Sequence, residues 1–372
     1  MSNRTPEPSG GSYGWLYGDD SATRPVAKVS DDLPPPNLPP PGRKADGGRT
    51  PPKPRKKRKF GRFVGLLLTA WLIFLIAVPI WAWSRIERID AEPDSERPAN
   101  QLGTNYLLVG SDSRKGLTKE QQQELATGGD SGGRGRTDTI MLMHVGSGPT
   151  LLMSIPRDSL VDIPGYGRTK INAAFAYGGP ELLVETIESN TGIRVDNFIE
   201  IGFGGLVKLV DAIGGIEICP KEDVKDKDAG LDLKQGCQQA DGAIALGYSR
   251  SRHTYATQDI QRVQSQREVL GAIASKTKSP WTVINPLRYF RTAEGASTSL
   301  RIGENVSMLD GARFAFELSS SVSGKGLNCT VPLRDFAVTW DPERAPQMFD
   351  LIKRDRTSQI KGLCTTDGLP KG

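Results

Sequence analysis

Short clusters of arginine and aspartate recur through the middle of this 372-residue chain, in which histidine occurs only twice. Guanidinium groups recognise phosphate oxygens through planar, bidentate contacts, and paired carboxylates can hold the hard cation that accompanies a diphosphate. The clusters therefore favour a phosphate ester as the substrate. Each cluster by itself can equally be a surface ion pair, since such pairs are common and weak. The clusters are Gly110-Ser111-Asp112-Ser113-Arg114, Arg136-Thr137-Asp138-Thr139, Pro156-Arg157-Asp158, Ser249-Arg250-Ser251-Arg252 and Asp259-x-x-Arg262-x-x-x-Gln266.

A long uncharged segment indicates where this chemistry takes place. The 21 residues from Phe63 to Trp83 carry no charge, and a helix of that length crosses about 30 Å of hydrocarbon at ~1.5 Å per residue. Pro79 lies inside the segment, but proline is tolerated in membrane spans. The alternatives are a buried helix and a cleaved signal peptide, whose cleavage site needs small residues that Trp81-Ala82-Trp83 does not provide. Residues 63–83 are therefore predicted to form an uncleaved transmembrane helix.

The charges that flank this segment predict its orientation. The basic juxtamembrane segment 53–62 contains seven cations, whereas a mixed group of charges follows Trp83. The positive-inside rule then places the N-terminus in the cytoplasm and the rest of the chain outside the cell membrane. In a soluble protein the same basic segment would suggest nucleic-acid binding, but beside a membrane span it favours contact with anionic lipid.

The formal net charge of +5 is unevenly distributed, because residues 1–62 carry +7 and the remainder carries −2. The arginines beyond the span are therefore expected to form a local pocket, which argues against nucleic acid as a partner. Residues 1–52 are rich in Gly, Ser, Asp and Pro and are predicted to be a disordered cytoplasmic tail. The stretch from Pro34 to Pro41 could instead dock in an aromatic groove of a cytoplasmic partner.

All four cysteines follow the predicted span, where an oxidising environment lets them pair. Three connectivities are possible, and we favour Cys219–Cys237 with Cys329–Cys364 because both bonds close short local loops. A metal site is the competing interpretation. It is disfavoured because the spacing Cys-x-x-Cys is absent from the sequence and no histidine lies nearby in it.

Apolar runs beyond the span alternate between strand and helix patterns. Strands are predicted at 105–110, 139–145, 150–155, 197–201 and 216–219, and helices at 180–191, 203–213 and 259–276. The last helix places Arg262 and Gln266 one turn apart on one face. The alternation predicts an α/β/α sandwich around a central mixed β-sheet. We expect an extracytoplasmic stalk at 84–101, a catalytic domain at 102–366 and a short tail at 367–372.

The clusters together resemble the motifs of a known family. Between the third and fourth clusters lie Lys170-Ile171-Asn172-Ala173-Ala174 and Gly178-Gly179, and Tyr248 precedes Arg250. The order and spacing of these motifs over roughly residues 102–275 are similar to those of the LytR-CpsA-Psr family. Such proteins are membrane-anchored transferases that move a glycopolymer from a polyprenyl diphosphate carrier onto peptidoglycan. The resemblance implies the same phosphotransferase activity here, with teichoic acid, capsular polysaccharide or arabinogalactan as candidate polymers.

The resemblance also implies roles for individual residues. Asp112 and Asp138 would be ligands of a Mg²⁺ ion on the diphosphate. Arg136 and Arg157 would be catalytic. Asp158 would support them or act as the base. For Asp158 and for Arg114, a purely structural ion pair is the alternative. The diphosphate-binding set is Arg114, Arg136, Arg157, Arg250, Arg252, Arg262 and Gln266. These roles agree with the residue chemistry, because phosphoryl transfer requires charge neutralisation and positioning more than a covalent nucleophile.

The chain departs from the family pattern in two places. Ile260-Gln261 stands where Phe-Gly is usual, and Ser265 stands where an arginine often precedes the glutamine. The second change is expected to remove one phosphate contact. For the lipid part of the substrate, an apolar slot is expected within 198–213, with Phe198, Phe203 and Val207 as candidates. The plainer interpretation of an apolar stripe at helical spacing is that it belongs to the core.

The sequence also carries a feature of another enzyme class. The string Gly129-Asp130-Ser131-Gly132-Gly133 matches the nucleophile segment of trypsin-like proteases, but both histidines, His144 and His253, follow it in the chain. The order that such proteases require is therefore absent from the sequence. The main alternatives are a pyrophosphatase that releases lipid phosphate without an acceptor, and a non-catalytic wall-polymer or lipid-binding protein.

Overall fold

A seven-stranded mixed sheet forms the centre of the folded domain in the computed structural model, which describes residues 57–113, 135–226, 229–251, 258–335 and 338–370. Neighbouring strands run both parallel and antiparallel: β2 pairs in parallel with β7 and in antiparallel with β3. In spatial order the strands are β1 (Glu87–Ile89), β12 (Leu300–Gly303), β7 (Asn197–Gly202), β2 (Thr104–Ser111), β3 (Thr137–Val145), β4 (Leu151–Ser154) and β13 (Leu327–Thr330).

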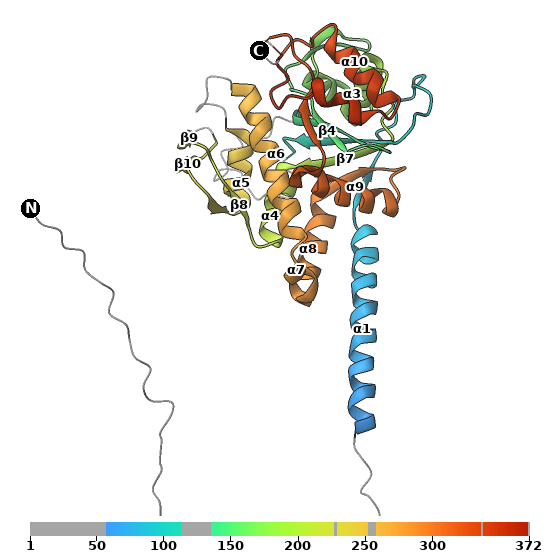
Figure 1. The fold of residues 1–372 in the computed structure, drawn as a ribbon, viewed down its shortest axis with the longest axis vertical. Coiled ribbons are helices and arrows are strands. Elements are labelled where there is room, and N and C mark those ends of the chain that lie inside the picture. Colours follow the sequence, from blue (N-terminus) through green and yellow to red (C-terminus); the bar gives the residue numbers. More distant parts are fainter. Residues whose placement is uncertain (1–56, 114–134, 227–228, 252–257, 336–337, 371–372) are drawn as a thin grey trace, which may run out of the picture. The chain divides into compact units, whose positions relative to one another are not determined.

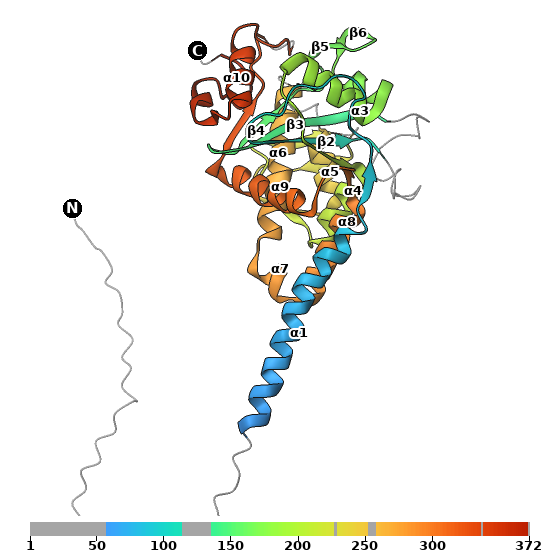
Figure 2. The same cartoon turned by 90° about the vertical axis from the view of Figure 1, so that its right-hand side faces the viewer.

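Helices cover both faces of this sheet (Figures 1 and 2). Side chains alternate along β2, so Leu107 and Val109 pack under α3 (Asn172–Thr191) and α10 (Arg344–Lys353). Tyr106 and Leu108 face the opposite side, where α6 (Gln258–Thr277) and α9 (Met308–Ser320) contribute to the core. Alternation of this kind is what a strand buried on both faces requires. The predicted α/β/α sandwich with a central mixed sheet is confirmed.

A second layer of short elements extends the domain beyond the ends of β7 and β12. Helices α4 (Phe203–Ala212) and α5 (Gly242–Arg250) share an apolar cluster with α6, and α7 (Pro280–Ile284) leads into α8 (Pro286–Ser299). Three two-stranded sheets are also present: β5 (Leu160–Ile163) with β6 (Gly167–Lys170), β8 (Ile216–Ile218) with β11 (Gln238–Ala240), and β9 (Val224–Asp226) with β10 (Leu231–Leu233). A π-helix at Ser321–Lys325 and a 3-10 helix at Thr357–Gly362 complete the described elements.

Several elements differ from the sequence-based boundaries for local reasons. Helix α3 begins at Asn172 and is interrupted at Gly179, which has φ 71° and ψ −154°. The helix predicted from Pro180 is therefore the second half of a kinked helix, because proline cannot continue the helix that precedes it. Residues 84–101, for which a stalk was expected, contain β1, which pairs with β12 at the edge of the main sheet.

Helix α1 (Lys57–Trp83) carries the predicted span and begins within the basic segment. Among the described residues it is the one helix long and apolar enough to cross a membrane, over Phe60–Trp83. Most of its apolar side chains are exposed, so it is not a core helix of the domain. Near its C-terminal end, Trp81 stacks on Phe290 of α8 with 5.0 Å between ring centroids.

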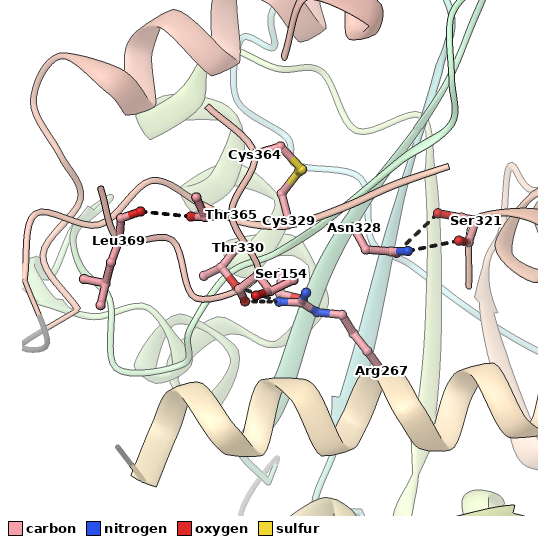
Figure 3. The surroundings of a disulfide bond; sticks show 10 residues. Ser154, Arg267, Ser321, Asn328, Cys329, Thr330, Cys364, Thr365 and Leu369 are labelled. Carbon is pink, nitrogen blue, oxygen red and sulfur yellow. Dashed lines mark hydrogen bonds between the residues drawn. A yellow bond between two sulfur atoms is a disulfide. The ribbon is translucent and has the colours of Figure 1, made fainter. Parts of the chain in front are cut away.

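Both disulfides pair as the favoured connectivity predicts. Cys219 bonds to Cys237 between the ends of β8 and β11, and Cys329 of β13 bonds to Cys364. Around the second bond, Arg267 of α6 donates to Ser154, Thr330 and the carbonyl of Thr366 (Figure 3). Burial is the main reason that the pKa of Arg267 falls to about 10, so the side chain is still cationic at neutral pH. It joins α6 to the sheet and to the C-terminal segment.

Candidate functional site

Asp112 and Asp138 lie together where the β2–β3 pair ends. The strand register moves from Gly110 opposite Thr139 to Ser111 opposite Thr137, which leaves Asp138 as the extra residue of a β-bulge. A bulge redirects one side chain relative to its neighbours, and bulges are common next to active sites. The backbone N–H of Asp112 donates to the carbonyl of Arg136 at 2.9 Å. Asp112 and Asp138, with 25 residues between them in sequence, thus lie at the same end of the β2–β3 pair.

The Asp112 carboxylate is fixed by backbone geometry. Its Oδ1 accepts from the backbone N–H of Arg136 at 2.6 Å. Gly135 precedes that residue with φ +79°, and a Cβ atom there would stand only 2.6 Å from the same carboxylate oxygen. Glycine is required at this position both for the left-handed backbone and for the close approach. The side chain of Arg136 itself is exposed.

A tight turn after β4 presents the next two candidate residues. The N–H of Ser159 donates to the carbonyl of Pro156 at 3.0 Å, which leaves Arg157 and Asp158 at the centre of the turn. Arg157 Nη1 donates to Oδ1 of Asp138, and Arg157 Nε lies 3.7 Å from Asp158. Lys170 Nζ is 2.9 Å from Asp158 Oδ1. The result is a chain of alternating charges that runs from the bulge to β6.

Helix α6 contributes Arg262 and Gln266 from one face, as predicted. Both side chains are buried, and Arg262 is only 1% exposed. Gln266 Nε2 donates to the carbonyls of Asp138 at 3.3 Å and Ser249 at 3.4 Å, so this amide joins β3, α5 and α6. Arg250 at the end of α5 lies over the ring of Phe203, 5.0 Å from its centroid. A cation over an aromatic face is held in place by the ring quadrupole.

Asp138, Arg250 and Gln266 border one pocket between the sheet and α4, α5 and α6. Its polar part is formed by Asp138, Ser249, Arg250 and Gln266. Its remaining wall is largely apolar and is formed by Leu108, Ile201, Phe203, Leu206, Leu246, Val269 and Leu270. The pocket therefore joins a hydrophobic cavity to a group of charged and amide side chains. A ligand with one apolar and one anionic end would be complementary to both parts.

The three candidate lipid-binding residues have different environments. Phe203 lines the pocket. Val207 is buried against Phe203 and Leu246, and Phe198 packs with Leu107 and Val109 under α3, on the other face of the sheet. Leu206 and Leu246 were not singled out from the sequence, although Leu206 lies within the stretch that was expected to form the slot. Arg114 and Arg252 lie outside the described residues, as does the protease-like string at 129–133.

His144 is fully buried and has a structural environment. Its Nδ1 lies 2.8 Å from Asn105 Oδ1, and its Nε2 lies 3.1 Å from Asp355 Oδ1. Burial opposes ionisation of Asp355, but hydrogen bonds from His144 and Ser147 outweigh it and hold the pKa of that carboxyl below its ordinary value. The network ties β2 and β3 to the second residue after α10. Among the residues that the structure describes, His144 is not part of the pocket wall.

The fold and the pocket define a class of protein: an α/β/α domain that carries a long apolar helix and an amphipathic pocket with an arginine-bearing polar part. Residues 84–322 match the LytR_cpsA_psr family, and the chain belongs to that family. It is 44% identical over 328 residues to the probable cell wall biosynthesis protein LcpB of Corynebacterium glutamicum, a match that covers 84% of this chain and 76% of that protein.

Two solved structures share the fold. The LytR-Csp2A-Psr enzyme from Actinomyces oris superposes with a TM-score of 0.58 at 20% identity, over 72% of this chain and 96% of that one. A structure described as TagT bound to LI-WTA superposes with a TM-score of 0.52 at 24% identity, over 74% of this chain and 98% of that one. The α/β/α architecture is therefore common to chains whose sequences have diverged widely.

Proposed function

We propose that this protein is a phosphotransferase that moves a glycopolymer from a polyprenyl diphosphate carrier to peptidoglycan. The observation that carries the proposal is the pocket, in which an apolar wall suited to an isoprenoid chain adjoins Asp138, Arg250 and Gln266. Membership of the family and the similarity to a cell wall biosynthesis protein support this substrate class. So does the related fold of TagT, whose structure is described as bound to LI-WTA.

We infer that α1 anchors the enzyme as a single-pass membrane protein with its N-terminus in the cytoplasm. The cations that precede the span support this orientation. The two disulfides support an extracytoplasmic position for the domain, because such bonds persist in oxidising compartments. Peptidoglycan and the lipid carrier would then meet at the outer side of the membrane.

In the proposed reaction, an acceptor hydroxyl of peptidoglycan attacks the phosphorus that bears the glycan. A new phosphodiester bond forms, the bridging P–O bond breaks, and polyprenyl phosphate leaves with the electron pair. Arg157 and Arg250 would bind the phosphate oxygens and offset their charge. Asp158 would accept the hydroxyl proton while Lys170 and Arg157 hold it in place. Transfer of this kind depends on positioning and electrostatics more than on covalent catalysis.

Asp112 and Asp138 would hold Mg²⁺. The donor set fits, because two carboxylates lie at the same end of the β2–β3 pair, and Mg²⁺ is commonly bound by one or two carboxylates together with phosphate oxygens and water. The ion would neutralise charge on the diphosphate. The chain itself holds both carboxylates in place: the backbone N–H of Arg136 donates to Asp112, and the side chain of Arg157 donates to Asp138.

The test is transfer of a labelled polyprenyl-diphosphate glycan to peptidoglycan by the full chain, with and without a chelator. Asp138→Ala should lower the rate by on the order of 100-fold or more while retaining lipid binding through the apolar wall. Asp162→Ala is the matched control, since that carboxylate is exposed on the β5–β6 hairpin and should leave the rate unchanged. Full activity of Asp138→Ala, or indifference to the chelator, would contradict the proposed site.

The products separate the alternatives. A pyrophosphatase would release lipid phosphate and free polymer phosphate without a polymer–peptidoglycan product, and a binding protein would release neither. Arg157→Lys and Arg250→Lys should restore only part of the activity lost in the alanine variants, because an ammonium group cannot reproduce the planar fork of a guanidinium.

A further inference from the structure

The hairpin formed by α7 and α8 lies beside the apolar helix rather than above it. The hydroxyl of Tyr289 in α8 donates to the carbonyl of Leu75 at 2.9 Å, and the ring of Tyr289 lies 5.9 Å from that of Phe74. Leu75 precedes Trp83 by eight residues, which places this contact about 12 Å inward from the end of α1 at ~1.5 Å per residue. In both views α7 lies on the side of the domain from which α1 extends (Figures 1 and 2).

The tip of this hairpin exposes large apolar side chains. Trp281, Val283, Ile284 and Leu287 are 58%, 41%, 62% and 57% exposed. No charged residue occurs from Ser279 to Leu287, whereas Lys278 precedes this stretch and Arg288 and Arg291 follow it. An apolar tip between flanking cations is typical of elements that lie in the interface of a bilayer.

Helix α9 presents a second exposed apolar surface near the end of the span. Its exposed residues include Met308, Leu309, Ala312, Ala315 and Phe316, which fall on one helical face. Leu309 and Phe316 are 80% and 65% exposed. The helix is seated directly on the apolar anchor, because a Cβ atom at Gly311 would be 2.5 Å from the ring of Trp83.

We propose that the α7–α8 tip and the exposed face of α9 dock on the outer leaflet of the membrane, with the tip inserted among the lipid chains. This docking surface rests on the proposed spanning of the membrane by α1. If α1 crosses the bilayer, a hairpin hydrogen-bonded to Leu75 cannot stand clear of it. The apolar tip is then buried in lipid, and the cations beside it reach the anionic head groups.

The occupant follows from continuity with α1. A protein partner or a second copy of the chain could also cover an apolar face. The hydrogen bond from Tyr289 to the carbonyl of Leu75 favours lipid instead, because it places the hairpin beside the part of α1 that would lie within the bilayer. Lipid contacts both α1 and the tip without any further component. Exposed apolar surfaces of this kind mark interaction sites in general, and their place beside the span specifies the bilayer.

Spin labelling of the full chain in nanodiscs that contain phosphatidylglycerol and phosphatidylcholine tests the proposal. The four native cysteines are bonded in pairs, so Ile284→Cys supplies one reactive thiol. Leu72→Cys within α1 is the reference for lipid depth, and Tyr166→Cys on the β5–β6 hairpin is the exposed control; those side chains are 59% and 57% exposed. Collision of each label with oxygen, which enters lipid, and with a water-soluble nickel chelate gives its depth.

The Ile284 label should resemble the Leu72 label, with oxygen access and little nickel access, whereas the Tyr166 label should collide freely with nickel. Nickel access at Ile284 equal to that at Tyr166 would overturn docking while leaving the anchor intact. Shielding from both reagents would mean a protein contact and would also overturn it. Nickel access at the Leu72 label would contradict both the membrane anchor and the docking of the tip. None of these readouts depends on turnover, so they are independent of the proposed transferase activity.

A second label experiment adds negative charge to the uncharged tip. Adding Val283→Glu and Leu287→Glu to Ile284→Cys should expose the label to nickel, because carboxylates at the tip oppose burial in lipid. A label that remains shielded in this variant would contradict insertion of the tip.

Discussion

At the residue scale, the site depends on contacts that leave little room for change. Gly135 has no side chain and a left-handed backbone, and the Asp112 carboxylate occupies the space that a side chain would need. Two of the candidate arginines also have defined contacts: Arg157 donates to Asp138, and Arg250 lies over the face of Phe203. Small changes at such positions should therefore affect the chemistry before they affect the fold.

Gly135→Ala should separate these two effects. A left-handed alanine costs about 1 kcal/mol, and the new methyl group must also displace the Asp112 carboxylate. We expect a modest loss of stability together with a loss of transfer on the order of 100-fold, since displacing a reacting group by 1 Å has effects of that size. Gly165→Ala is the matched control, because φ there is +76° and a Cβ atom would meet nothing within 4 Å. Equal activity in the two variants would show that the position of Asp112 is unimportant.

Asp355 should give stability a specific dependence on pH. Its pKa is lowered in the folded protein by bonds from His144 and Ser147 that outweigh burial, so the ionised form favours folding. That contribution is present above the unfolded pKa of about 3.9 and is lost as pH falls through the lower folded pKa. The melting temperature of Asp355→Asn should fall below that of the parent at neutral pH and approach it below about pH 4. Asparagine tolerates the backbone of Asp355, with φ 53°, so a difference that stays constant with pH would contradict the linkage.

Part of the placement of the candidate residues was evident from the sequence. The carboxylates and arginines of separate clusters were expected to converge, and hydrogen bonds do join Asp138 to Arg157 and Gln266, while Arg250 lines the same pocket. The chemical roles of these residues stay predictions. The bulge at Asp138 was not evident, because it arises from a register change between two strands. The face on which Phe198 lies was not evident either, since alternation predicts two faces without saying which one borders a pocket.

At the scale of elements, α6 connects the pocket to the rest of the fold. Gln266 reaches β3 and α5, while the adjacent Arg267 reaches β4, β13 and the C-terminal segment (Figure 3). Elements with long apolar runs were predicted well, because burial of both faces leaves a clear pattern. The strands β1, β12 and β13 of the main sheet were missed, because each is short, lacks a long apolar run and pairs with a partner far away in sequence. The short strands β5, β6 and β9–β11 and the helices α5 and α7–α10 were not predicted either.

Arg267→Ala should loosen this connection. The substitution removes the donor to the hydroxyl oxygens of Ser154 and Thr330 and leaves the carbonyl of Thr366 with the Thr330 hydroxyl as its donor. The loss is expected to cost about 1–3 kcal/mol. For a domain of this size that corresponds to a melting temperature lower by several degrees, about 2–4 °C for each kcal/mol. Thermal unfolding in detergent measures it. Arg168→Ala, which removes an exposed ion pair on the β5–β6 hairpin, should change the melting temperature little; an equal effect of both substitutions would remove the special role of Arg267.

At the scale of the whole molecule, one apolar helix separates a basic N-terminal segment from a nearly neutral domain with two disulfides. In the proposed topology, this division assigns each part of the chain to one side of the membrane. Charge patterns can predict such a layout, whereas they could not predict that α8 and α9 pack against the end of α1. Contacts between α1 and α8 join residues more than 200 positions apart, and no local pattern encodes them.

The predicted orientation can be measured with a membrane-impermeant maleimide on intact cells. Tyr166→Cys should be labelled from outside, because its position on the β5–β6 hairpin is exposed. Ser30→Cys in the N-terminal segment should be labelled only after the membrane is permeabilised. The unsubstituted chain, with its cysteines bonded, should take up little reagent. Labelling of Ser30→Cys in intact cells would reverse the topology and with it the compartment of the reaction.

Formation of the Cys329–Cys364 bond should affect the structure of the pocket. The bond joins the two segments that supply Thr330 and Thr366, the acceptors of Arg267, and Arg267 follows Gln266 directly on α6. If the domain is exported as proposed, its thiols are reduced before export, so this support for α6 is incomplete while the chain is still in the cytoplasm. Oxidative folding thus becomes a maturation step: the lipid-linked substrate would meet a finished pocket only on the side of the membrane where its acceptor is found.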